Sequence, residues 1–136
     1  MPSDAGAGWA DLRAGLEADL RRVGDRMSGL SAAQLAAPVP PYGSRADAAR
    51  RAAGVLSVAA QGVEARAGER EPAWRPLPVL ADFAVADQVA VVGHDLAQAV
   101  SDVDPGTVVW APGGRRSALE VLTDAAEVLA ATRRLL

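Results

Sequence analysis

The chain has 136 residues, half of them apolar, which is enough for a single domain with a sizeable hydrophobic core. Its net charge of −3 argues against a nucleic-acid surface, which needs a net basic face. It has no cysteine and all 14 of its basic residues are arginine, so disulfides, thiolate chemistry and lysine chemistry are excluded.

The sequence also indicates where the protein works. It contains no run of about 20 apolar residues, and its N-terminus lacks the basic and apolar regions of a signal peptide. We therefore expect a soluble, cytoplasmic protein that contacts no membrane. Arginine in place of lysine, together with 31 alanines, is typical of a GC-rich genome such as that of an actinobacterium.

The first predicted helix covers residues 4–29. Apolar side chains recur along it three or four residues apart, with charged residues between them, as in one helix of a bundle. This stripe consists of Trp9, Leu12, Leu16, Leu20, Val23, Met27 and Leu30. Ser31 and Gln34 then form a capping box for a short helical turn, which a proline cluster at 38–41 ends.

A second helix is predicted over residues 45–67, opened by a capping box of Ser44 and Asp47 and ended by a glycine. Most residues of its inward face are small, which permits a close approach of neighbouring helices. The face consists of Ala49, Ala52, Leu56, Ala59, Ala60 and Val63. A proline-bearing linker over 68–78, which includes Trp74, leads to the next helix.

The third helix is predicted over residues 80–102, where the same spacing continues. Its apolar positions are Val85, Val89, Val92, Leu96, Val100 and Val103. The β-branched run at 89–92 would also suit a strand. We reject that alternative, because the helical period continues on both sides of the run and a lone strand would have no partner.

Residues 104–114 are predicted as a loop, because they begin with an Asp-Pro-Gly turn sequence. Ser117 and Glu120 form a third capping box, so the fourth helix is predicted over 118–135. Its stripe consists of Leu119, Leu122, Ala126, Leu129, Arg133 and Leu136, widened by Val121, Val128 and Leu135.

Together these elements predict an all-α fold in which residues 1–136 form a single antiparallel four-helix bundle. The short connections between the first and second helices, and between the third and fourth, favour antiparallel neighbours. A bundle with an alanine-rich face often packs against another copy of itself, so a homodimer is one of the partners that the sequence leaves open.

His94, the only histidine, lies in the third predicted helix. It could act as a general base or as a single metal ligand, together with Asp95 or a distant carboxylate; the alternative is a partly exposed structural histidine. Catalytic metal sites need about three protein ligands. One histidine cannot make a histidine-based site. Carboxylates could supply the remaining ligands, but the sequence lacks the Glu-x-x-His pair of carboxylate-bridged bundles, so we predict no metal site and no cofactor.

Carboxylates of the third helix are a second candidate site. Asp82 and Asp87 are five residues apart, and Asp95 lies about two turns after Asp87. They could form a paired-carboxylate site, or they could line a solvated face whose charge favours the N-terminus of the helix.

A third candidate precedes the fourth helix, where the sequence reads Gly113-Gly114-Arg115-Arg116. Backbone N–H groups and two guanidinium groups would converge there on an anion; the alternative is a flexible loop with solvated arginines. Two of the three tryptophans, Trp74 among them, also lie in predicted loops. Loop tryptophans cap the ends of a core or line a pocket or a partner surface.

Two segments of the chain contain characteristic residues in a recognisable order. The first comprises Leu30, Leu35, Pro38, Pro40, Gly43, Ser44 and Asp47. The second comprises Asp104, Pro105, Trp110, Gly113, Gly114 and Arg116. In this order they resemble the mycothiol-dependent maleylpyruvate isomerase N-terminal domain, within the broader DinB-like group, and the likeness extends over nearly the whole chain.

The resemblance implies a four-helix bundle with a particular site. Members hold a divalent metal with a histidine on the second helix, and with a glutamate or histidine plus a histidine on the fourth; the metal activates a low-molecular-weight thiol. In this chain Arg51 stands at the second-helix position and Glu127 matches the carboxylate, while the last histidine would fall near Ala131 or Thr132. An arginine at a ligand position repels a cation, so the resemblance implies the fold without the metal.

Three hypotheses follow. The first is a non-catalytic DinB-like bundle that binds a small molecule or a protein partner; its candidate ligand-binding residues are Arg51, His94, Trp110, Arg115 and Arg116. The second is a thiol-dependent, mycothiol-type transferase or isomerase with a non-standard or absent metal site; its candidate catalytic residues are His94, Glu127, Arg51 and Asp87. The third is a structural or homo-oligomeric module. We favour the first.

Overall fold

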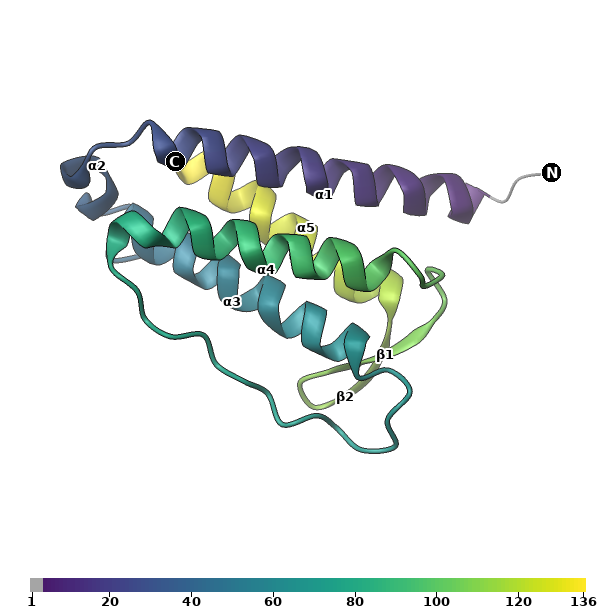
Figure 1. Cartoon of the computed structure of the whole chain (residues 1–136). Helices are drawn as coiled ribbons and strands as arrows, with labels where there is room; N and C mark the ends of the chain where they lie inside the picture. The colour runs from purple at the N-terminus through teal and green to yellow at the C-terminus, as the bar shows by residue number, and fades with distance from the viewer. Residues whose placement is uncertain (1–3) are drawn as a thin grey trace.

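Four long helices make up most of the structure, whose computed structural model describes residues 4–136 (Figure 1). They are α1 (Asp4–Ser28), α3 (Arg45–Glu64), α4 (Val85–Val100) and α5 (Ala118–Leu135). The shorter elements are α2 (Ala32–Ala36), the 3₁₀ turn η1 (Asp82–Ala84), and the strands β1 (Val108–Ala111) and β2 (Gly114–Ser117). The prediction of a mostly helical chain is confirmed.

The helix starts follow the predicted caps. The hydroxyl groups of Ser31, Ser44 and Ser117 each accept a backbone N–H three residues later, and the first and last of these complete a capping box. The third predicted helix begins later than expected, because Pro76 and Pro78 keep the preceding chain extended. Its first turn is η1, and the α-helical part begins only at Val85.

The predicted loop at 104–114 is wrong in part, because β1 and β2 form an antiparallel hairpin there. The residues of β1 are β-branched or aromatic at three of four positions, which favours a strand. Gly113 has a φ of +90°, a conformation that suits glycine at a tight turn. Trp110 and Arg115 are direct partners across the two strands.

The four long helices form a closed ring of contacts, in which α1 and α3 each pack against both α4 and α5. α1 runs parallel to α5 and α3 runs parallel to α4, while the two pairs run in opposite directions (Figure 1). The prediction that α1 and α3, or α4 and α5, are neighbours is wrong: these pairs lie diagonally. The connection from α1 to α3 contains α2, and the connection from α4 to α5 contains the hairpin. These elements span the distance between the two diagonal helices. Within the described chain, each helix is too short or too polar for a membrane crossing.

The hydrophobic core lies between these helices, where the predicted apolar stripes meet. The stripes of α1, α3 and α4 point inward as predicted. That of α5 is displaced: Leu119 is 41% exposed and Arg133 is exposed, whereas Ala125 is buried with Leu122 and Leu129. Because α5 packs against α1 and α3 on two sides, its buried face is wider than a single 3–4 stripe.

The linker between α3 and α4 covers the outer side of α3 (Figure 1). Gln61 of α3 is buried and forms a reciprocal pair with the backbone of Arg75: its amide nitrogen donates to the carbonyl at 3.1 Å, and its oxygen accepts the N–H at 2.8 Å. At the other end Arg50 donates to the Leu80 carbonyl at 2.7 Å and to Asp82 at 2.6 Å. These bonds satisfy backbone groups of a segment that has no secondary structure of its own.

The hairpin lies directly on the last turns of α3. Gly62 is buried there, and a Cβ atom at this position would collide with the backbone carbonyl of Trp110 and approach the Trp74 ring at 3.4 Å. A residue without a side chain is therefore required, because the obstacle is backbone and cannot rotate away. This close approach fixes the height of β1 above α3.

We expect Gly62→Ala to destabilise the protein by about 1–3 kcal/mol, because the new methyl group forces β1 away from α3. The matched control is Gly54→Ala in the same helix, where a Cβ would meet nothing within 4 Å. That change should instead increase the free energy of unfolding by up to about 1 kcal/mol, because alanine has a higher helix propensity than glycine. Urea unfolding of both variants measures the difference, and equal effects would contradict the packing described for Gly62.

Candidate functional site

A cavity of about 510 Å³ opens between α3 and α5 and is bounded at one end by the hairpin. Its apolar walls include Val55, Val58 and Ala59 of α3, Trp110 of β1, and Val121 and Ala125 of α5. The volume lies in the range of small-molecule pockets, about 300–1,000 Å³, and such pockets combine apolar walls with a few polar groups.

Three charged side chains line this cavity: Arg51 of α3, Arg116 of β2 and Asp124 of α5. Arg116 is neutralised, since its Nη1 lies 2.8 Å from Asp124 and its Nε lies 3.5 Å from Glu120. The hydrogen bond to Asp124 raises the pKa of Arg116 above its ordinary value. Arg51 is exposed, and its guanidinium group forms no hydrogen bond or ion pair with any other residue of 4–136.

Arg115 and Trp110 anchor the hairpin to the C-terminal end of α3. The guanidinium carbon of Arg115 lies 3.8 Å from the centre of the Trp110 ring, which is a cation–π contact. Arg115 also donates to the carbonyls of Arg66 at 2.7 Å and Gly68 at 2.6 Å, and the Trp110 indole donates to Gly68 at 3.1 Å. These are carbonyls that the helix end and the turn after it would leave without partners.

Both arginines of the predicted anion site at Gly113–Arg116 are therefore engaged in contacts within the protein. The alternative of a flexible loop is wrong, because residues 114–117 form a strand. Arg115 and Arg116 are successive residues of a strand, so their side chains point to opposite faces. Arg115 binds carbonyls of the chain after α3, and Arg116 binds carboxylates of α5. The two guanidinium groups serve different contacts and do not converge on a common ligand.

Glu71, in the linker, fastens the turn of the hairpin at the rim of the cavity. Its Oε1 accepts the Trp74 indole N–H and the Gly113 backbone N–H, each at 2.9 Å. The bond from Trp74, and then that from Gly113, holds the pKa of Glu71 below its ordinary value of 4.5. Pro112, which lines the cavity, immediately precedes Gly113.

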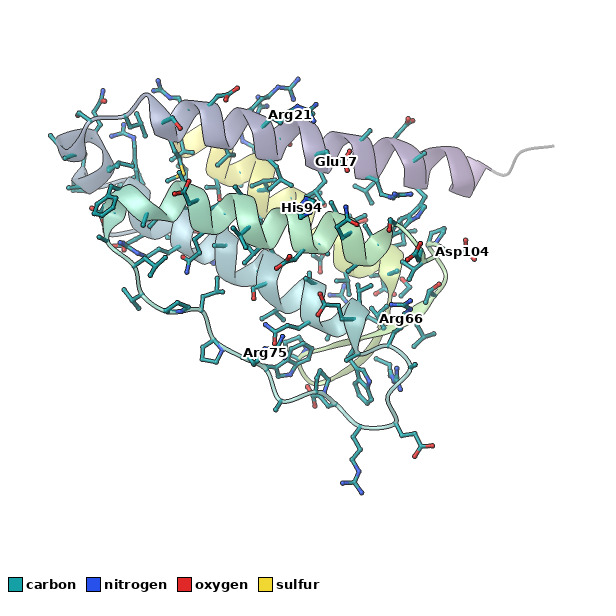
Figure 2. The ribbon with its side chains drawn as sticks, in the orientation of Figure 1. Glu17, Arg21, Arg66, Arg75, His94 and Asp104 are labelled. Carbon is teal, nitrogen blue, oxygen red and sulfur yellow. The ribbon has the colours of Figure 1, made fainter. Side chains whose placement is uncertain are left out.

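The other predicted site residues lie apart from this cavity. His94 is exposed in the middle of α4, away from the hairpin end of α3 where Arg66 lies (Figure 2). Asp87 is exposed near the start of α4, and Glu127 borders a shallow groove between α1 and α5. Of the predicted ligand-binding residues, the structure brings Arg51, Trp110 and Arg116 to one cavity.

The carboxylates of the third predicted helix also remain separate. Asp82 binds Arg50, whereas Asp87 and Asp95 are exposed on α4. Among residues 4–136 no three His, Asp or Glu side chains are grouped so that they could hold a metal ion. Thr132, one of the two positions where the DinB-like pattern has a histidine, is buried and donates its hydroxyl to the Val128 carbonyl at 2.8 Å.

Sequence reasoning missed Asp124 and the apolar walls of the cavity. Asp124 lies eight residues after Arg116, across the boundary between a strand and a helix, so no regular spacing links the two. No protein-family model, no curated protein and no solved structure matches this chain. The DinB-like resemblance therefore depends on the sequence pattern, and the function has to be argued from the chain's own residues.

The pKa of Glu71 tests how the hairpin turn is held. Because the folded-state value is lowered, the stability that this contact contributes is fully present above pH 4.5 and is lost as the pH falls through the folded-state value. We expect Trp74→Phe, which removes the indole donor, to raise the Glu71 pKa toward 4.5. NMR titration of the Glu71 carboxyl carbon measures it. Trp9→Phe, whose indole donates to Val103 instead, should leave the value unchanged; an unchanged value in Trp74→Phe would contradict the contact.

Proposed function

We propose that this protein is a non-catalytic four-helix bundle of the DinB-like kind, which binds a small organic ligand in the cavity between α3 and α5. The proposal on the fold is supported by the ring of four long helices and by the caps at Ser44 and Ser117. It is supported further by the order of the two segments that resemble the mycothiol-dependent isomerase domain.

The cavity is the observation that carries the proposed function. Its walls are made by rigid elements, two long helices and a hairpin fastened by Glu71, Trp110 and Arg115. A volume of about 510 Å³ is several times that of a cavity of about 150 Å³ that holds benzene. An apolar ligand could therefore be accommodated without rearrangement of the backbone.

Binding without catalysis agrees with the residues at this place. Arg51 occupies the position where the DinB-like pattern has a metal ligand, and its charge opposes a cation. The cavity is lined by arginines, one aspartate and apolar groups, and the aspartate is held in an ion pair with Arg116. None of these groups is a free nucleophile or a free general base.

The alternative is a thiol-dependent transferase or isomerase of the mycothiol type. It would need His94, Asp87, Glu127 and Arg51 to act on one substrate. Catalytic groups have to lie within hydrogen-bond reach of the reacting atoms, directly or through one water. Because His94 and Asp87 lie on α4, Glu127 borders the α1–α5 groove and Arg51 lines the α3–α5 cavity, the geometry favours binding.

A neutral probe, naphthalene-2-carboxamide, tests the cavity. With about 13 heavy atoms and a ligand efficiency of about 0.3 kcal/mol per atom, we expect a dissociation constant of about 1 mM or lower. Val55→Trp, which places a bulky indole group in the cavity from the side of α3, should abolish binding. NMR titration of backbone amide signals measures the affinity and shows which residues respond.

Val91→Trp is the matched control, because Val91 is 61% exposed on α4, which does not line the cavity. It should bind the probe as the unmodified protein does. The proposed function would be wrong if the probe failed to bind the unmodified protein, or if its binding survived Val55→Trp in a correctly folded variant.

A further inference from the structure

The charged groups around the cavity are not all paired. Asp124 and Arg116 form one ion pair, and Glu120 adds a second carboxylate to the same arginine. Arg51 remains as a cation without a partner among residues 4–136, on the wall opposite α5. A ligand that enters this cavity therefore meets one unpaired guanidinium group and a pair that is already satisfied.

The position of Arg51 along α3 gives the cavity a polar end. Arg51, Val55 and Val58 are spaced four and three residues apart, so they share one face of the helix. The hairpin covers the same helix farther on, at Gly62. From Arg51 to Ala59 the helix rises by about 12 Å, at about 1.5 Å per residue. Arg51 thus stands at one end of an apolar floor and Trp110 stands at the other.

We propose that the natural ligand is a monocarboxylate with an apolar body, such as a bicyclic aromatic acid or a medium-chain fatty acid, whose carboxylate is bound by Arg51. The body would extend along α3 toward Trp110. This proposal rests on the proposed function, since it names the class of ligand that the same cavity takes.

The chemistry of the lining separates this class from others. The planar guanidinium fork of a single arginine matches a carboxylate in a bidentate geometry. A phosphate ester or a dicarboxylate would bring a second negative charge, and the nearby carboxylates of Asp124 and Glu120 would repel it while Arg116 is already engaged. A cationic ligand would be repelled by Arg51. A neutral ligand would fit the walls but would leave Arg51 without a partner.

Two probes of nearly equal shape test the proposal: naphthalene-2-carboxylate and its neutral amide, naphthalene-2-carboxamide. We expect the unmodified protein to bind the carboxylate at least about 10-fold more tightly than the amide, since hydrogen bonds to charged groups are the stronger ones. Arg51→Gln should reduce this preference to about 1-fold while the affinity for the amide is kept. Arg51→Lys, which keeps the charge but loses the fork, should give an intermediate preference.

Arg21→Gln is the matched control, because Arg21 is an exposed arginine on α1 and its loss changes the net charge equally (Figure 2). It should keep the full preference. The proposal is overturned, and the proposed function kept, if the unmodified protein binds both probes equally, or if Arg51→Gln retains the preference, while Val55→Trp still abolishes binding of the amide. If neither probe binds the unmodified protein, both proposals fail.

Discussion

Close contact between the backbone of β1 and Gly62 of α3 determines where the hairpin lies. Because no Cβ intervenes, Trp110 reaches the carbonyl of Gly68, and Arg115 reaches that carbonyl and the carbonyl of Arg66. The hairpin therefore does two things at once: it satisfies polar groups after the end of α3, and it bounds one end of the cavity. A hairpin held farther from α3 would do neither.

The small side chains of α3 explain both its central place and the cavity beside it. Alanines and glycines let α4, α5, the linker and the hairpin all approach this helix. Each small residue also buries less apolar surface than a leucine would, by about 0.8 kcal/mol for each missing methylene. Because α3 offers few large apolar side chains, specific polar contacts hold the linker against it. These contacts include the pair of Gln61 with Arg75 and the bonds of Arg50.

Electrostatics distinguish Arg51 from the other arginines near α3. Arg50 binds Asp82, Arg115 binds backbone carbonyls and Arg116 binds Asp124, so each of these stabilises the fold. The hydrogen bond of Asp82 with Arg50 raises the pKa of that arginine. An arginine that borders an apolar cavity and lacks such a partner among the described residues has no comparable structural contact, which is why we assign it to ligand binding.

The helices could be predicted from the sequence because apolar periodicity and serine caps are local signals, each of which involves residues only a few positions apart. The same local signals, the β-branched residues of β1 and the glycines after it, could have indicated the hairpin. The cavity could not be predicted: Arg51, Trp110 and Asp124 line the same cavity only because α1 and α3 lie diagonally and β1 rests on Gly62. The sequence by itself determined which segments are helical, since each helix depends on its own residues. Only the tertiary structure decided which side chains share a site, since that depends on contacts between residues far apart in the chain.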